Sequence, residues 1–379
     1  MPAKPDAIVL TQALVRMNTI NPPGHEDQCT AYLGELLEGA GFRCTIHEFA
    51  PRRASLVARI GGNPTRSPLC FTGHVDVVPL GAAPWSRDPF AADITEGKLY
   101  GRGSSDMKSG VAAFVTAAIE LAPQLAPGPG LVLVITAGEE TGCEGAFHLA
   151  ELQKVERILG TAGAMVVAEP TSNYPLVGHK GAFWLKATTK GVTAHGSMPE
   201  RGDNAVYKAA RAVSALERFD FGLAPDALMG RATLNVGTIR GGLNVNSVPD
   251  AAEIGIDIRT IPGQRHPELL GCLGRHLGPE VELTPVLDVE SVYTDPANAW
   301  VRRVFAIMAP LLGEPIVPRS VTYFTDAAAL TRAFAAPPTV ILGPGEPQLA
   351  HQTDEYCFTH RIEQAVAANR ELIRDWCAL

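Results

Sequence analysis

Residues 69–76 read LCFTGHVD, and this stretch decides the fold class. An apolar run of strand length leads directly into His74 and Asp76. Two more apolar runs, at 131–136 and 164–168, also lead into acidic residues. Strands that are apolar throughout are buried on both faces, as in parallel sheets that helices cover on each side. We therefore predict an α/β fold with a mostly parallel sheet and helices on both faces.

Helical patterns lie between these strands. Amphipathic periodicity predicts helices over residues 6–17, 26–38 and 108–122. After Trp300 the alternation resumes with a helix, a strand over 316–323, a second helix, a strand over 339–342 and a C-terminal helix. Helices and strands thus alternate at both ends of the chain, which indicates one α/β domain built from two separate segments.

Residues 179–288 follow a different pattern. The run 252–259 alternates apolar with polar or small residues, which predicts a half-buried strand. The strands and helices around it follow the order β-α-β-β-α-β, the ferredoxin-like α+β pattern. We expect two domains: residues 1–178 together with 289–379, and an inserted domain of residues 179–288.

The composition limits the classes of function. A chain of 379 residues that is 46% apolar can bury the cores of two domains. Its net charge of −8 argues against a nucleic-acid partner, because phosphate binding requires a basic face. We find no apolar run of the roughly 20 residues that span a membrane and no secretory signal. The seven cysteines form no Cys-x-x-Cys pair, so we expect reduced thiols, a cytoplasmic protein and no membrane partner.

Chemically active side chains follow the predicted strands. In open α/β sheets, ligands bind beyond the carboxyl ends of the strands, which meet at one edge. The residues at these ends are His74, Asp76, Glu139, Glu140, Glu169 and His351, and Asp106 precedes the helix predicted at 108–122. Each acidic residue alone could be an ordinary helix cap or turn former. So many carboxylates in one place would repel one another without cations, and ligation by imidazole and carboxylate suits zinc, with manganese or cobalt also possible.

These motifs resemble a family of two-zinc hydrolases that includes acetylornithine deacetylase, succinyl-diaminopimelate desuccinylase, aminoacylase and glutamate-releasing carboxypeptidases. The resemblance is carried, in order along the chain, by residues 73–79, Trp85, 99–108, 139–140, 168–171, 191–196 and 350–352. The family has a lid domain where this chain has its insertion. The resemblance therefore implies a metal-binding catalytic domain of residues 1–178 and 289–379, and a lid of residues 179–288 through which a homodimer forms.

The resemblance also implies a set of ligands for two Zn²⁺ ions, for which Co²⁺ or Mn²⁺ could substitute. His74 and Glu169 would bind one ion, and Glu140 and His351 would bind the other. Asp106 would bridge the two ions and would be followed by a cis peptide bond.

Further residues receive catalytic or binding roles from the resemblance. Glu139 would be the general base, and Asp76 would hold the ring of the histidine two positions before it. His195 would complete the oxyanion site, either in its own subunit or in a partner's. Asn244 and Arg259, which we place on strands of the inserted domain, would grip the substrate carboxylate. A surface salt bridge is the alternative for Arg259.

Together these features predict a hydrolase that cleaves the amide bond of a small N-acyl amino acid. Several motifs look most like those of acetylornithine deacetylase, although Tyr323-Phe324-Thr325-Asp326 departs from that enzyme's pattern. The desuccinylase branch usually has an arginine at the position of His179. The absence of that arginine argues against a desuccinylase. The alternatives are a dipeptidase or carboxypeptidase acting on a dipeptide, a desuccinylase, and an inert binding relative.

Overall fold

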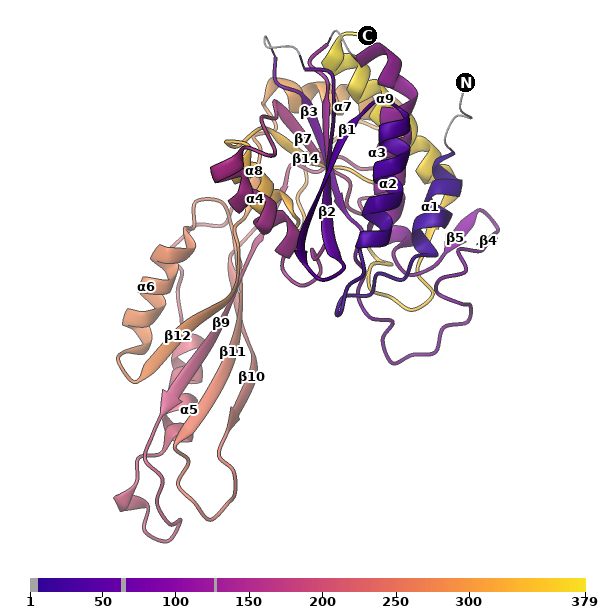
Figure 1. Ribbon diagram of the computed structural model, residues 1–379. Coiled ribbons are helices and arrows are strands. Elements are labelled where there is room, and N and C mark those ends of the chain that lie inside the picture. Colours follow the sequence, from indigo (N-terminus) through magenta and orange to yellow (C-terminus); the bar gives the residue numbers. More distant parts are fainter. Residues whose placement is uncertain (1–5, 63–65, 126–127) are drawn as a thin grey trace. The chain divides into compact units, whose positions relative to one another are not determined.

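The structure is a computed structural model that describes residues 6–62, 66–125 and 128–379 (Figure 1). The chain divides into two compact units. The first consists of Met1–Gly178, Tyr293–Arg319 and Thr325–Leu379, and the second of His179–Val292 and Ser320–Phe324. The inserted segment expected at 179–288 is therefore longer by four residues and is joined by a short stretch from later in the chain.

The first unit is built on a six-stranded sheet in the order β1-β2-β6-β3-β7-β14. These strands are β1 (Arg43–Ala50), β2 (Arg53–Ile60), β3 (Leu69–His74), β6 (Leu131–Thr136), β7 (Ala164–Val167) and β14 (Thr339–Ile341). β3 pairs in parallel with β6 and β7, and β14 in parallel with β7. Only β2 runs against its neighbours β1 and β6. The predicted, mostly parallel α/β sheet is confirmed.

Helices cover both faces of this sheet. They are α1 (Ala7–Val15), α2 (Asp27–Gly39), α3 (Ser109–Leu125), α4 (Glu144–Glu156), α7 (Ala299–Leu312), α8 (Ala327–Ala333) and α9 (Thr359–Cys377). A glycine of α2 packs over Leu56 and a glycine of α4 over Ser55. Because successive residues of a strand point to opposite faces, these two helices lie on opposite sides of β2 (Figure 1). Among the described residues, no helix is both long and apolar enough to cross a membrane.

Close packing at the end of β3 brings the strand against the segment that precedes α3. All residues of β3 are buried. A Cβ at Gly73 would lie 2.5 Å from Met107 Cε and 3.0 Å from Val111 Cγ2, so glycine lets both side chains approach the strand closely. The peptide bond between Asp106 and Met107 is cis, as the family resemblance implied. Asp106 lies beside the end of β3 in a short loop (Ser104–Lys108), in which Asp106 and Met107 have non-helical backbone angles.

A three-stranded antiparallel sheet, which the sequence analysis did not predict, joins distant parts of the first unit. It consists of β4 (Ile94–Thr95), β5 (Lys98–Tyr100) and β15 (Tyr356–Phe358), in the order β15-β5-β4. Tyr356 pairs with Tyr100, so the chain just before β15 lies beside the chain just after β5. These two segments carry His351 and Asp106 respectively.

The second unit has the predicted β-α-β-β-α-β order. Its elements are β9 (Gly181–Lys190), α5 (Ala205–Leu216), β10 (Thr233–Gly241), β11 (Ala251–Thr260), α6 (His266–Leu277) and β12 (Val281–Val289). The sheet is antiparallel, in the order β10-β11-β9-β12. One face is apolar and packs against both helices through a core that includes Phe183, Ile254, Ile256, Ala209 and Leu273. The chain enters and leaves this unit through β8 (Gly178–His179) and β13 (Val292–Tyr293), and a short turn, η2 (Pro199–Arg201), precedes α5.

The prediction of a strand over residues 316–323 is wrong. These residues are irregular, and only Val321 forms an isolated bridge. Pro318 has no N–H to donate to a ladder. Val317 pairs instead with a side chain, because its N–H donates to the Tyr174 hydroxyl and its carbonyl accepts from the same hydroxyl, both at 2.8 Å.

Candidate metal centre

The carboxyl end of β3 places His74 among carboxylates from three other segments. Its Nε2 atom lies 3.3 Å from Asp106 Oδ1, 3.9 Å from Glu169 Oε1 and 4.0 Å from Glu139 Oε2. All four side chains are buried or nearly so. The strand ends that were predicted to meet at one edge of the sheet therefore do so.

A second histidine approaches the same aspartate from the other side. His351 Nε2 lies 3.5 Å from Asp106 Oδ2 and 3.0 Å from Glu140 Oε2. The two oxygens of Asp106 thus face different histidines. His74, Asp106 and Glu140 each offer one ligand atom, and these atoms all lie within 4.8 Å of one another.

The orientation of His74 is set by the chain two residues further on. Its Nδ1 atom lies 3.0 Å from the backbone oxygen of Asp76 and 3.5 Å from Asp76 Oδ1. Because a carbonyl oxygen only accepts, we assign a hydrogen to Nδ1, which leaves Nε2 facing the other carboxylates. Asp76 therefore contacts the ring of His74 more closely through its backbone oxygen than through its carboxylate.

The Asp76 carboxylate fixes the loop that follows β6. It accepts hydrogen bonds from the backbone N–H groups of Glu139 at 3.1 Å and Glu140 at 3.2 Å, and from Asn21 Nδ2 at 2.9 Å. These bonds, with His74, keep the pKa of Asp76 below its usual value although burial opposes this. Neighbouring residues Glu139 and Glu140 are thereby held with their side chains toward different histidines.

The electrostatics of the cluster fit a cation. Burial raises the pKa of Glu139 and Glu169 well above the usual range, and nearby carboxylates add to this. Asp106 Oδ1 and Glu140 Oε1 are buried and accept no hydrogen bond from any residue that the structure describes. Such atoms are costly unless something positive meets them. The mixed imidazole and carboxylate donors suit zinc, and they also tolerate manganese or cobalt.

One carboxylate of the cluster was not predicted as a site residue. Asp326, just before α8, is buried and accepts a hydrogen bond from the Thr136 hydroxyl at the end of β6. Burial raises its pKa to about 6. In the sequence, Thr325-Asp326 before a helix looks like a helix cap, so no local signal separated it from many similar pairs.

The remaining predicted residues belong to the second unit. His195 lies in the loop after β9, is exposed, and has Nδ1 2.8 Å from Ser197 Oγ. Asn244 was placed on a strand, and this is wrong: it lies in the exposed loop between β10 and β11. Arg259 lies on β11, where its Nε is 2.9 Å from Asp257 Oδ1. The salt bridge considered as an alternative for Arg259 is therefore present.

The structure does not bring His195 and Arg259 together within the second unit. Arg259 pairs with Ala182 near the start of β9, whereas His195 follows Lys190 at the other end of that strand. At about 3.3 Å per residue, the eight steps from Ala182 to Lys190 span about 26 Å. Asn244 shares the His195 end, because Gly196 donates a hydrogen bond to Asn246 O at 2.7 Å.

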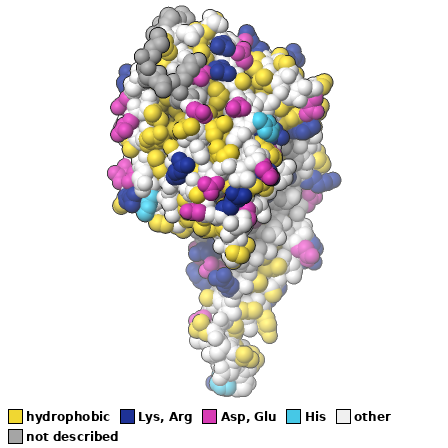
Figure 2. Space-filling model, turned by 90° about the vertical axis from the view of Figure 1, so that its right-hand side faces the viewer, with side chains coloured by type: hydrophobic (Ala, Val, Ile, Leu, Met, Phe, Trp, Pro, Cys, Tyr) yellow, Lys and Arg dark blue, Asp and Glu magenta, His cyan; other side chains and the backbone are white. Residues whose placement is uncertain are grey.

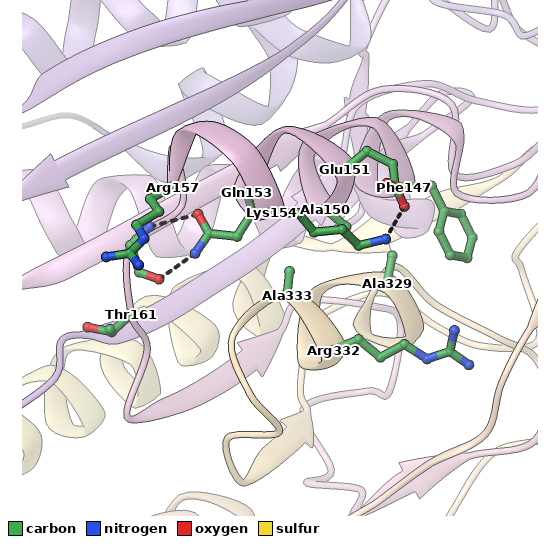
Figure 3. A pocket seen from close by; sticks show the side chains of 11 residues that line it. Phe147, Ala150, Glu151, Gln153, Lys154, Arg157, Thr161, Ala329, Arg332 and Ala333 are labelled. Atoms are coloured by element: carbon green, nitrogen blue, oxygen red, sulfur yellow. Dashed lines mark hydrogen bonds and ion pairs between the residues drawn. The ribbon is translucent and has the colours of Figure 1, made fainter.

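A separate cavity of about 600 Å³ lies between α4 and α8 (Figure 3). Its lining, as far as the structure describes it, contains no histidine. Its one carboxylate, on Glu151, is paired with Lys154 at 2.6 Å. On the face shown in Figure 2, basic and acidic side chains are interspersed without a continuous patch of one sign. The His74 cluster therefore remains the candidate centre.

Comparison with known proteins gives one family. Residues 70–375 match the profile of Peptidase family M20/M25/M40. The chain is 32% identical to a probable succinyl-diaminopimelate desuccinylase of Staphylococcus epidermidis, over 93% of each chain. It is 31% identical to an acetylornithine deacetylase of Proteus mirabilis, over 91% of this chain and 89% of that one.

Solved structures share the fold over almost the full length. An M20 family metallo-carboxypeptidase from Sulfolobus solfataricus aligns with a TM-score of 0.79 at 18% identity, covering 99% of this chain and 100% of that one. A dinuclear metal-binding peptidase of the same family from Bacillus subtilis aligns with a TM-score of 0.71 at 16% identity, over 97% of each chain.

Proposed function

Because the chain belongs to Peptidase family M20/M25/M40 and is a metal-dependent hydrolase, we propose that it cleaves the amide bond of a small N-acyl amino acid with two metal ions. The observation that carries this proposal is the placement of Asp106, whose two oxygens face His74 and His351 at 3.3 and 3.5 Å. A carboxylate between two histidine sites is the arrangement that a bridged metal pair requires.

The ligands divide between two ions. His74 and Glu169 would hold one ion, Glu140 and His351 the other, and Asp106 both. When bound, such ions lower the pKa of a coordinated water and polarise a carbonyl oxygen. Zinc is our first choice, with cobalt or manganese as substitutes.

Glu139 is the residue that we assign as general base. It is buried beside the cluster, and its backbone is fixed by Asp76, whereas its neighbour Glu140 faces His351 at 3.0 Å. A carboxylate so held can accept the proton of an attacking water and return it to the leaving amine. Glu140, which contacts His351, is assigned as a metal ligand instead.

The second unit supplies the substrate contacts. Arg259 and Asn244 would bind the carboxylate of the substrate, and His195 would donate to the developing oxyanion. Since about 26 Å of strand β9 separates the end beside Arg259 from the end that leads to His195, we propose that one small substrate does not contact both residues of the same copy. We therefore propose a homodimer formed through the inserted unit, in which His195 and Asn244, which share one end of the unit, both act in the partner's site. The seven free thiols suit a reducing cytoplasm, where we place the protein.

The acyl group is proposed to be acetyl and not succinyl. In the desuccinylase branch of the family that the sequence resembles, an arginine usually occupies the position of His179. Burial lowers the pKa of His179 to about 4 here, and its Nδ1 lies 2.8 Å from the backbone oxygen of Lys180. A neutral histidine provides no charge to pair with a second carboxylate.

A hydrolysis screen tests the substrate class. N-acetyl amino acids, N-succinyl amino acids and dipeptides are incubated with the zinc-loaded protein, and the released amino acid is measured. We expect N-acetyl amino acids to give the highest kcat/KM. If kcat/KM is higher for dipeptides than for N-acetyl amino acids, the protein is a dipeptidase. If kcat/KM is highest for N-succinyl amino acids, the protein is a desuccinylase.

A further inference from the structure

Glu355 lies four residues after His351 and is completely buried. Its carboxylate points into the loop that carries Asp106. Oε1 accepts hydrogen bonds from the backbone N–H groups of Ser105 at 2.8 Å and Asp106 at 3.0 Å. Oε2 accepts one from the N–H of Gly103 at 3.1 Å. Three backbone N–H groups within four residues of this loop thus donate to one side chain, whereas the N–H of Ser104 donates to the Gly101 carbonyl.

Arg102 completes this arrangement. It is 1% exposed, and its Nη1 donates to Glu355 Oε2 at 2.7 Å. The same guanidinium donates to the backbone oxygen of Gln352 at 3.2 Å and to that of Pro79 at 3.2 Å. Gln352 follows His351, and Pro79 ends the segment that begins at His74. The pair therefore contacts all three chain segments that bring His74, Asp106 and His351 to the centre.

We infer that Glu355, paired with Arg102, is a positioning residue that holds the Asp106 loop in register with the segments bearing His74 and His351. This inference rests on the proposed function, because it assigns these three residues to the metal centre. A buried ion pair adds little net stability, since the cost of removing both charges from water offsets their attraction. Its hydrogen bonds instead specify one arrangement of a loop that has no regular structure of its own.

Glutamine cannot replace Glu355 without loss. Each carboxylate oxygen accepts two hydrogen bonds, so the amide nitrogen of glutamine would face two donors in either orientation. Outer groups that orient metal ligands typically change metal affinity by about 10–100-fold when altered. We expect Glu355→Gln to weaken binding of at least one ion by that factor.

The matched control is Glu120→Gln. Glu120 lies on α3 and is also paired with an arginine, Arg370, at 2.9 Å. It lies eleven residues into the helix, about 16 Å from its start at 1.5 Å per residue. Both variants lose one buried or half-buried carboxylate, but only one of them touches a ligand loop. We expect Glu120→Gln to bind metal like the wild type.

Two readouts test the inference without any substrate. Zn²⁺ affinity is measured by chelator competition, and amide hydrogen exchange is measured at Gly103, Ser105 and Asp106. In the wild type these loop amides should exchange as slowly as those of β6, and in Glu355→Gln at least ten times faster. Arg102→Lys, which keeps the charge but loses the fork of donors, should shift both readouts in the same direction.

A folded Glu355→Gln protein with wild-type zinc affinity and wild-type exchange overturns the inference. If neither variant folds, rapid exchange of the three amides in the wild type overturns it as well. A wild-type protein that binds two ions but hydrolyses no N-acyl amino acid contradicts the proposed function alone. The two claims are thus tested separately.

Discussion

Arg259 lies beside the start of strand β9, whereas His195 lies in the loop that follows the other end of this strand. Arg259 pairs with Ala182 and His195 follows Lys190, which puts about 26 Å of strand between them. Both were assigned to one substrate, one for its oxyanion and one for its carboxylate. The two assignments are compatible only if the residues reach a given substrate from different copies of the chain.

Mixed dimers test this arrangement. His195→Ala and Arg259→Ala should each lower kcat/KM. For His195→Ala, kcat itself should fall by about 10²–10³-fold, as for the loss of one oxyanion donor. When the two variants are mixed and their subunits reassort, half of the dimers are hybrids with one intact site. Activity should then recover to about a quarter of the wild-type value. No recovery in a mixture shown to contain hybrids would place both residues in one copy's site.

Asp106→Ala should lose both metal ions. Asp106 is the carboxylate with an oxygen toward each histidine, so its removal takes a ligand from both sites. Metal content after dialysis is measured by mass spectrometry. Asp375→Ala is the control. Asp375 lies on α9 and pairs with Arg303 of α7 at 3.0 Å, so its replacement should leave the metal content unchanged. Two tightly bound ions in Asp106→Ala would contradict the bridge.

Two glycine substitutions in helices should have opposite effects on stability. Gly34→Ala in α2 should raise the free energy of unfolding by up to about 1 kcal/mol, the usual gain of alanine in a helix. A Cβ there meets only Leu56 Cδ1, at 3.8 Å. Gly110→Ala in α3 would put a Cβ 2.2 Å from the backbone oxygen of Ala168, next to Glu169. It should cost about 1–3 kcal/mol, as overpacking does.

Urea unfolding of both glycine variants checks these values without metal. Equal stabilisation by the two substitutions would mean that α3 does not pack as closely on the chain after β7 as described. A loss of zinc affinity in Gly110→Ala alone would connect this packing to Glu169.

The fold class and family were accessible from the sequence because their signals are local. Residues 69–76 carry an uninterrupted apolar strand and two polar residues at its end, and burial on both faces follows from composition alone. The same reasoning failed for 316–323, where Pro318 and a tyrosine from elsewhere prevent strand pairing. Asn244 was misplaced because strand ends are poorly marked by alternation.

Glu355 could not be found from the sequence for a physical reason. Its partners are mostly backbone N–H groups, about 250 positions earlier in the chain. Backbone donors are the same at every residue type and leave no pattern. Asp326 was missed because its partner Thr136 lies 190 positions earlier in the chain. Metal ligands, in contrast, must be of particular residue types, and they were therefore visible as motifs.

The contrast between Glu139→Gln and Glu140→Gln tests the central claim most directly. Both proteins are loaded with zinc, and metal content and kcat are measured on the best N-acyl amino acid from the screen. Glu139→Gln should keep two ions and lose nearly all turnover, because the amide has the size of the carboxylate but cannot accept a proton. Glu140→Gln should first lose an ion, because its carboxylate faces His351 at 3.0 Å. Substantial turnover by Glu139→Gln with both ions bound would contradict the account.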